Sequence, residues 1–138
     1  MNRIIGFGII LIFLISCQYS FQLKNDVFLT EKIESVLKFD NGKIDFSQLN
    51  DFEWDNLIIL GPYSTIEEIG EKLNLNLKNI SKNGIKYSDY YDLIVFLKNN
   101  KSVKIVELKK AMQPIRTIIN KEKSLFVTDS VGILKLTE

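Results

Sequence analysis

The chain has 138 residues, with 18 basic and 17 acidic side chains, one cysteine and no histidine. An intramolecular disulfide is therefore excluded, and so are zinc sites of the usual kind, Ser-His-Asp catalysis and Cys-His catalysis. A chain so close to neutral has no electrostatic reason to bind nucleic acid, so we expect no nucleic-acid partner, and we expect no cofactor.

The first residues of the chain predict an export signal. Arg3 supplies a positive charge ahead of an apolar run from residue 4 to residue 15. The 13 residues from Ile4 to Ser16 would span roughly 20 Å as a helix, against a hydrocarbon core of about 30 Å. A permanent membrane-spanning helix is therefore not expected. An ordinary secretory signal fits the charge and the length, but it favours small residues before its cleavage site, and only Ser16 supplies one.

Leu14-Ile15-Ser16-Cys17 ends this leader with the cysteine. A leucine, a variable residue, a small residue and a cysteine, in that order, resemble the cleavage motif of bacterial lipoprotein signals. The resemblance implies cleavage between Ser16 and Cys17 and a thioether-linked diacylglycerol on Cys17. Two acyl chains anchor a protein stably in a membrane, since each buried methylene contributes about 0.8 kcal/mol. We therefore expect a lipid anchor in the cell membrane or the outer membrane, with the domain outside the cytoplasm.

The chain after the leader predicts one domain. We expect residues 1–16 to be the signal peptide, residues 17–25 to be the lipidated cysteine and a polar tether, and residues 26–138 to form a single α+β domain. The 122 residues that follow the cleavage site (138 − 16) suit one domain with a small apolar core.

Residues 26–39 predict the first helix of this domain. Leu29, Ile33, Val36 and Leu37 recur at helical spacing on one face, apart from the adjacent last pair. Thr30 is an alternative N-cap with a later start, and the Asn-Gly pair that follows favours an end of the helix. Residues 43–50 are expected to be a loop, because their apolar alternation is too short to predict a strand. Three of their side chains are expected to anchor this loop in the core: Ile44, Phe46 and Leu49.

Residues 54–64 predict a strand, a turn and the start of a helix. The apolar run from Leu57 to Leu60 is typical of a central strand buried on both faces, and Gly61-Pro62 ends it. Ser64-Thr65-Ile66-Glu67 fits a capping box, with Thr65 and Glu68 as a second register. The segment with Trp54-Asp55, the strand and Gly61-Pro62-Tyr63 also resembles a group of small uncharacterised bacterial lipoproteins, a resemblance that implies no known activity.

The next part of the chain predicts a loop and a hairpin. Residues 74–87 are rich in Asn, Lys and Ser and are expected to be a loop with a turn at Asn83-Gly84. Two segments, 91–98 and 101–108, flank Asn99-Asn100: residues 93–97 are apolar on both faces, as in a central strand, whereas Val103 and Ile105 alternate with Lys104. That pattern predicts two antiparallel strands, because Asn tolerates the positive φ of a tight turn.

The last part predicts a second hairpin, with strands at residues 124–129 and 131–137. Residues 109–120 are ambiguous, because Pro114 argues against a regular helix across their centre. Taken together, the elements predict a mostly antiparallel sheet of about five strands, with two helices packed on one face.

A cluster of tyrosines and carboxylates precedes the first of the hairpin strands. Tyr87, Asp89, Tyr90 and Tyr91 are a candidate contact surface for an envelope protein or a glycan, because tyrosine supplies rigid amphipathic area. The alternative is a strand entry in which Tyr91 packs and the polar groups face water, and the sequence favours this alternative.

Other polar groups suggest chemistry more weakly. Asp51, Glu53 and Asp55 lie two residues apart and would share a face of an extended segment, where two carboxylates could act as acid and base. They lack the spacing of an EF-hand calcium loop. Gly61-Pro62-Tyr63 could offer backbone amides to an anion, but a structural stop is the better interpretation.

The leading hypothesis is a non-catalytic, lipid-anchored envelope protein that binds or scaffolds another component. The alternative is an inhibitor or immunity-type protein that blocks a periplasmic enzyme, with residues 87–92 or an exposed strand edge as its face. A carboxylate-dependent hydrolase is the third hypothesis. It requires one concave pocket that holds two of five carboxylates: Asp51, Glu53, Asp55, Asp89 and Asp92.

Overall fold

The computed structural model describes residues 21–113 and 115–138. The predicted signal peptide, Ser16 and Cys17 lie outside the described residues. The described part contains two α-helices, α2 (Val27–Phe39) and α3 (Ile66–Leu73), and seven strands in two sheets. The strands are β1 (Lys43–Asp45), β2 (Asn56–Leu60), β3 (Asp92–Lys98), β4 (Lys101–Leu108), β5 (Ile119–Asn120), β6 (Leu125–Thr128) and β7 (Leu134–Leu136).

The central sheet has the strand order β4-β3-β2-β5, and every neighbouring pair in it is antiparallel. β3 pairs with β2 from Asn56 to Leu60, whereas β5 pairs with β2 at Asn56 and Leu57 alone. The second sheet has the order β1-β6-β7 and is also antiparallel. The predicted α+β class, the central strand and both predicted hairpins are confirmed.

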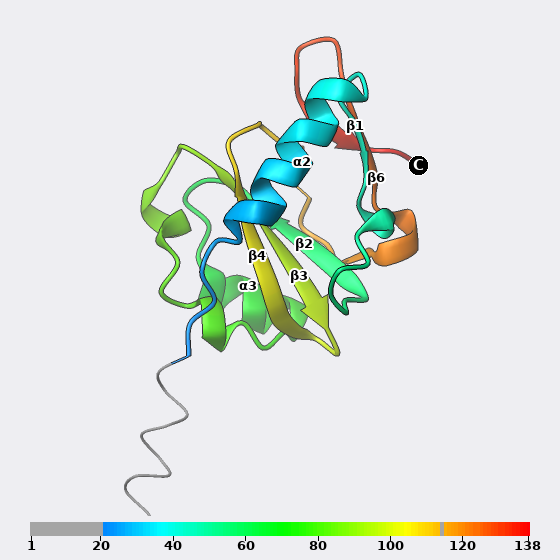
Figure 1. Ribbon diagram of the computed structural model, residues 1–138. Helices are drawn as coiled ribbons and strands as arrows, with labels where there is room; N and C mark the ends of the chain where they lie inside the picture. Colours follow the sequence, from blue (N-terminus) through cyan, green and yellow to red (C-terminus); the bar gives the residue numbers. More distant parts are fainter. Residues whose placement is uncertain (1–20, 114) are drawn as a thin grey trace, which may run out of the picture.

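Both faces of the central sheet are apolar and buried. Leu57 and Ile59 of β2 belong to a core cluster with α2 and the second sheet, while Ile58 and Leu60 belong to a cluster with α3 and the loop that follows it. The two helices therefore lie on opposite faces of the sheet (Figure 1). The prediction of two helices on one face was wrong, because strands that are apolar on both sides need cover on both.

The prediction of about five strands was also wrong, and the two extra strands are short. β1 has three residues within the expected loop, and β5 has two residues within the ambiguous stretch 109–120. β1, β6 and β7 form a sheet of their own instead of extending the central one. The anchors expected in the loop after α2 are confirmed, since Ile44, Phe46 and Leu49 are all buried.

α2 begins where Asp26 caps it. The Asp26 carboxylate accepts a hydrogen bond from the Leu29 backbone N–H at 2.9 Å and pairs with the Lys104 ammonium at 2.8 Å. The helix then buries Leu29, Ile33 and Leu37, which are spaced at three to four residues and so share one face. This face packs over β4 (Figure 1).

The chain is attached to the domain a few residues after Cys17. The Leu23 backbone N–H donates to the Asn79 carbonyl at 2.8 Å, and Asn25 forms an isolated parallel bridge with Ile105 of β4. All members of both apolar core clusters, together with the partly buried residues packed against them, lie between Leu23 and Leu136. The chain from Gln18 onward therefore contains the whole described core.

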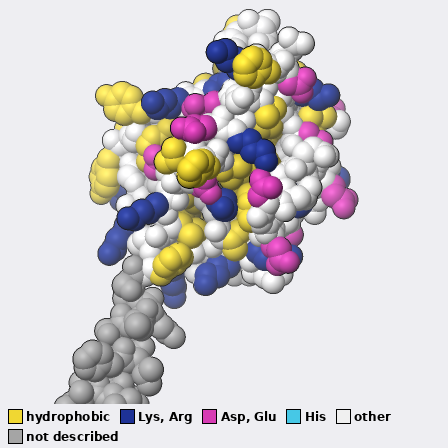
Figure 2. Space-filling view, viewed as in Figure 1, with side chains coloured by type: hydrophobic (Ala, Val, Ile, Leu, Met, Phe, Trp, Pro, Cys, Tyr) yellow, Lys and Arg dark blue, Asp and Glu magenta, His cyan; other side chains and the backbone are white. Residues whose placement is uncertain are grey.

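Charges of both signs are interspersed on the face that Figure 2 shows, with apolar side chains between them. No helix in the described part of the chain has both the length and the apolar character that crossing a membrane requires.

Candidate functional site

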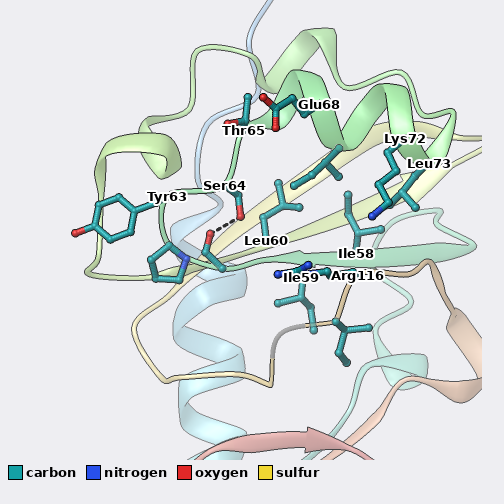
Figure 3. A pocket seen from close by; sticks show the side chains of 14 residues that line it. Ile58, Ile59, Leu60, Tyr63, Ser64, Thr65, Glu68, Lys72, Leu73 and Arg116 are labelled. Carbon is teal, nitrogen blue, oxygen red and sulfur yellow. Dashed lines mark hydrogen bonds between the residues drawn. The ribbon is translucent and has the colours of Figure 1, made fainter.

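A pocket of about 560 Å³ opens between β2, α3 and the segment that leads to β5 (Figure 3). Three parts of the chain line it: β2 with the loop after it, one face of α3, and two residues ahead of β5. The lining residues are Ile58, Ile59, Leu60, Gly61, Pro62, Tyr63, Ser64, Thr65, Glu68, Ile69, Lys72, Leu73, Ile115 and Arg116.

One side of the pocket is an open strand edge. β5 stops pairing with β2 after Leu57, so in the described residues no strand lies beside the rest of β2 on this side. The Lys121 backbone N–H donates to the Asp55 carbonyl at 2.9 Å, across the β5 side. Backbone groups in an antiparallel strand alternate between its two neighbours. The N–H and C=O of Ile59 therefore face the same side as those of Leu57 and as the Asp55 carbonyl, toward the pocket, whereas the Asp55 N–H donates to the Leu97 carbonyl of β3 at 2.9 Å.

The walls of the pocket are largely apolar. Ile58 and Leu60 are buried on the α3 side of the sheet, and Ile69 and Leu73 of α3 are half-buried above them. Ile66, Ile69 and Leu73 follow each other at three and four residues, which places them on the helix face turned to the sheet. Ile115 is half-buried on the opposite wall.

Two cations and one anion lie at the rim of these walls: Lys72, Arg116 and Glu68. The Lys72 side chain points from α3 toward β2 in Figure 3. The ion pairs of the described residues join Lys32, Lys104 and Lys135 to aspartates, so neither Lys72 nor Arg116 belongs to one of them. The rim therefore carries an excess of positive charge, which favours a ligand with a negative group.

The turn from β2 into α3 forms one end of the pocket. Tyr63 has a φ of 63° and an exposed ring, and its N–H donates to the Ile85 carbonyl at 3.0 Å. The Ser64 hydroxyl donates to the Gly61 carbonyl at 2.6 Å. Thr65 is the N-cap of α3 but makes no side-chain cap hydrogen bond. The predicted capping box is therefore wrong in both registers, because Ser64 bonds back into the turn and Thr65 lies at the cap without bonding it.

Asp92 positions the segment that forms the opposite wall. Its carboxylate is buried, with 7% of the residue exposed, and accepts a hydrogen bond from the Met112 backbone N–H at 2.8 Å. Burial raises the pKa of Asp92, and the Met112 hydrogen bond opposes that rise. A Cβ on Gly61 would lie 3.7 Å from the other Asp92 oxygen. Asp92 therefore ties the chain before Ile115 to the start of β3, next to the Gly-Pro turn.

The four residues of the predicted tyrosine surface do not share one environment. Tyr87 and Tyr90 are 83% and 81% exposed, and Asp89 is exposed as well. Tyr91 instead packs against the core beneath α3, and its hydroxyl donates to the Asn83 side-chain oxygen at 3.0 Å. Burial, followed by the charge of Glu107, raises the pKa of Tyr91. Tyr91 therefore serves the strand entry, and the other three remain a candidate surface.

The five candidate carboxylates lie in different settings, and none of them lines the pocket beside β2. Asp51 pairs with Lys32 at 2.9 Å, Glu53 is exposed, and Asp55 accepts a hydrogen bond from the Asn99 backbone N–H at 3.1 Å. Asp89 is exposed and Asp92 is buried. Within the described ranges, no three carboxylates group closely enough to hold a metal ion.

No sequence pattern predicts the pocket residues with the clearest chemistry. Arg116 lies in the ambiguous stretch 109–120, and Lys72 has no pattern that sets it apart from other helix-surface lysines. The one sequence signal for the pocket is the apolar strand that ends at Gly61-Pro62. The pocket forms there because the neighbouring strand, β5, is short and leaves one edge of this strand open. Comparison with known proteins finds no matching family model, no matching curated protein and no matching solved structure.

Proposed function

We propose that this protein is a non-catalytic, lipid-anchored binding module of the cell envelope, and that the pocket beside β2 is its binding site. The observation that carries the binding site is an apolar pocket of about 560 Å³ whose rim holds two cations outside any described ion pair. Binding pockets for small ligands commonly measure about 300–1,000 Å³, with apolar walls and a few polar groups. The expected ligand is largely apolar and carries a negative charge.

The anchor is proposed from the leader, which ends in the lipoprotein-like motif at Cys17. Five residues separate Cys17 from Leu23, which among the described residues is the first with a backbone hydrogen bond into the domain. A fully extended chain covers about 3.5 Å per residue. The lipid would therefore hold the domain close to the membrane surface, where an envelope component is the expected partner.

An inhibitor or immunity-type protein is the second candidate. The exposed rings of Tyr87 and Tyr90 favour it, because paired exposed tyrosines are typical of protein-binding surfaces. This candidate function predicts that a partner enzyme no longer binds the protein when both tyrosines are changed to serine. The pocket proposal predicts that this change has no effect on ligand binding.

Anilinonaphthalene sulfonate is a suitable probe of the pocket, because it combines apolar rings with one negative charge. We expect saturable binding to the chain from Gln18 onward, with enhanced fluorescence. The double variant Lys72→Glu/Arg116→Glu should weaken binding by roughly tenfold, since each exposed charge interaction contributes up to about 1 kcal/mol. The control Lys38→Glu/Lys43→Glu makes the same charge change at exposed residues that do not line the pocket. Equal affinity in both double variants, or no saturable binding, would contradict the proposal.

A further inference from the structure

We infer that the pocket takes an extended polypeptide segment, which adds to the central sheet as a strand along the open edge of β2. The inference rests on the proposed function, because it names the class of ligand for the same pocket. It goes further in assigning the recognition to the backbone of Ile59 and to the charges of Lys72 and Arg116.

The first argument is the unpaired edge. β2 is paired along its whole length with β3 but at two residues alone with β5. The N–H and C=O of Ile59 face the pocket, although only 4% of this residue is exposed. Backbone polar groups away from bulk water are strongly favoured to find a partner, and an added strand supplies one donor and one acceptor at the required spacing.

The second argument is the shape of the site. The open edge is flanked by α3 on one side and by Arg116 on the other (Figure 3). Ile115 also lines the pocket and packs against the core cluster on the face away from α3, so the edge lies at the bottom of a groove. The edge of a second folded copy would meet these walls first. A single extended chain is thin enough to enter. The three residues from Ile58 to Leu60 span about 10 Å at the usual strand rise, so the inserted part is short.

The third argument is the chemistry of the walls. Successive side chains of a strand point to opposite faces, so an added strand would direct them alternately toward α3 and toward Ile115. Both walls are apolar. The α3 wall carries Lys72 together with Glu68, and the opposite wall carries Arg116, so the net charge of the three is positive and neither cation belongs to a described ion pair. The structure therefore selects a segment that presents apolar residues to both walls and carries Asp or Glu on each face, and it disfavours a basic segment.

Residues 115–118 of the chain itself could compete with a ligand for this edge of β2. Continuing the β5 register would place Thr117 opposite Ile59, because Leu57 already pairs with Ile119. Residues 115–118 leave that line and form no ladder with β2. If they closed onto β2, the Ile59 N–H would be hydrogen-bonded without any ligand.

The test measures amide exchange and chemical shifts by nuclear magnetic resonance on the chain from Gln18 onward. In the free protein, the Ile59 amide should exchange faster than its neighbours Ile58 and Leu60, whose amides face β3. The probe is the capped peptide acetyl-Thr-Val-Glu-Val-Val-Glu-Val-amide, which carries one Glu and apolar residues on each face of an extended strand. We expect it to slow exchange at Ile59 by at least roughly tenfold at saturation, because a strand hydrogen bond then protects the amide.

Three control peptides and two variants define the interaction. A peptide with Lys in place of Glu should bind roughly tenfold more weakly, and Lys72→Glu/Arg116→Glu should reverse that preference. Lys38→Glu/Lys43→Glu should leave the preference as it is. A peptide with N-methyl groups on alternate residues loses the N–H groups on one edge, so one of its two methylation patterns should abolish binding and the other should not.

The outcomes separate this inference from the proposed function. An Ile59 amide that is already protected in the free protein would show that Thr117 closes the edge, and the inference would be wrong. If anilinonaphthalene sulfonate binds the pocket but the peptide leaves Ile59 exchange unchanged, the pocket stands and strand addition fails. If neither probe binds, both proposals fail. Peptide binding that tolerates both methylation patterns would also overturn strand addition.

Discussion

The carboxylate of Asp92 accepts a hydrogen bond from the backbone N–H of Met112 at 2.8 Å, and this contact fixes the chain that leads to the wall of the pocket. Asp92→Ala would leave that buried N–H without its acceptor. We expect a loss of about 1–3 kcal/mol in the free energy of unfolding, together with weaker binding of the apolar anion. Urea denaturation followed by Trp54 fluorescence measures the first effect, since Trp54 is the chain's single tryptophan and only 3% exposed.

The same carboxylate gives stability a dependence on pH. Burial raises the pKa of Asp92 above its usual value, so the folded state binds this proton more tightly than the unfolded state does. The Asp92 contribution to stability therefore falls as the pH rises from the unfolded pKa through the folded pKa. Asp92→Asn keeps an acceptor oxygen without the charge. It should remove this part of the pH dependence, and a stability profile unchanged in shape would contradict the assignment.

Asp26 gives the stability of the fold the opposite dependence on pH. The Lys104 ammonium, and next the Leu29 backbone N–H, lower the pKa of Asp26. Its contribution to stability is therefore present above the unfolded pKa and is lost as the pH falls through the folded pKa. Asp26→Ala removes both the helix cap and the ion pair and should cost about 1–2 kcal/mol near neutral pH. Asp26→Asn keeps a cap and should cost less, so equal losses in urea denaturation would argue against the capping role.

Gly42 and Gly132 form a matched pair for a test of the turns. Both have a positive φ, 75° and 87°. A Cβ on Gly42 would lie 2.5 Å from the Thr128 hydroxyl, whereas a Cβ on Gly132 would have nothing within 4 Å. Gly132→Ala should cost about 1–2 kcal/mol from its φ alone. Gly42→Ala should cost more, because it also displaces Thr128. Similar unfolding free energies for the two variants would contradict the close contact.

The lipid anchor is tested at Cys17. The protein produced in a bacterial host that processes lipoproteins should partition into the detergent phase of a clouding nonionic detergent. Cys17→Ala should move it to the aqueous phase, unless the leader is retained, which the mass of the product reveals. Ser20→Ala provides a control with a small change near the same end. If the unmodified protein already partitions into the aqueous phase, the anchor is refuted.

Much of the fold could be predicted because its elements have strong local patterns. The β3–β4 hairpin follows from two apolar segments around Asn99-Asn100, and α2 from apolar residues at helical spacing. The arrangement of the layers could not be predicted, because an apolar run such as Leu57–Leu60 shows that both faces are covered but not by what. β5 has two residues, too few for any periodic pattern.

The site depends on tertiary structure even more than the fold does. Lys72 and Arg116 are 44 positions apart in the sequence, and no spacing rule joins them. They line one pocket because β5 pairs with only two residues of β2, and α3 lies on the other side of the edge that stays open. Tyr91 was assigned correctly by the alternative that the sequence favoured, since amphipathic rings at the start of a strand commonly pack.

The central claim is that the anchored protein binds an envelope component through the pocket beside β2. Site-specific photocrosslinking in living cells tests it most directly, with a photoreactive phenylalanine in place of Leu73 in the full, membrane-anchored chain. The control is the same residue in place of Val131, which is exposed and does not line the pocket. We predict a discrete adduct from position 73 but not from position 131, and its loss in the Lys72→Glu/Arg116→Glu background. No adduct from position 73, or the same adducts from both positions, would contradict the claim.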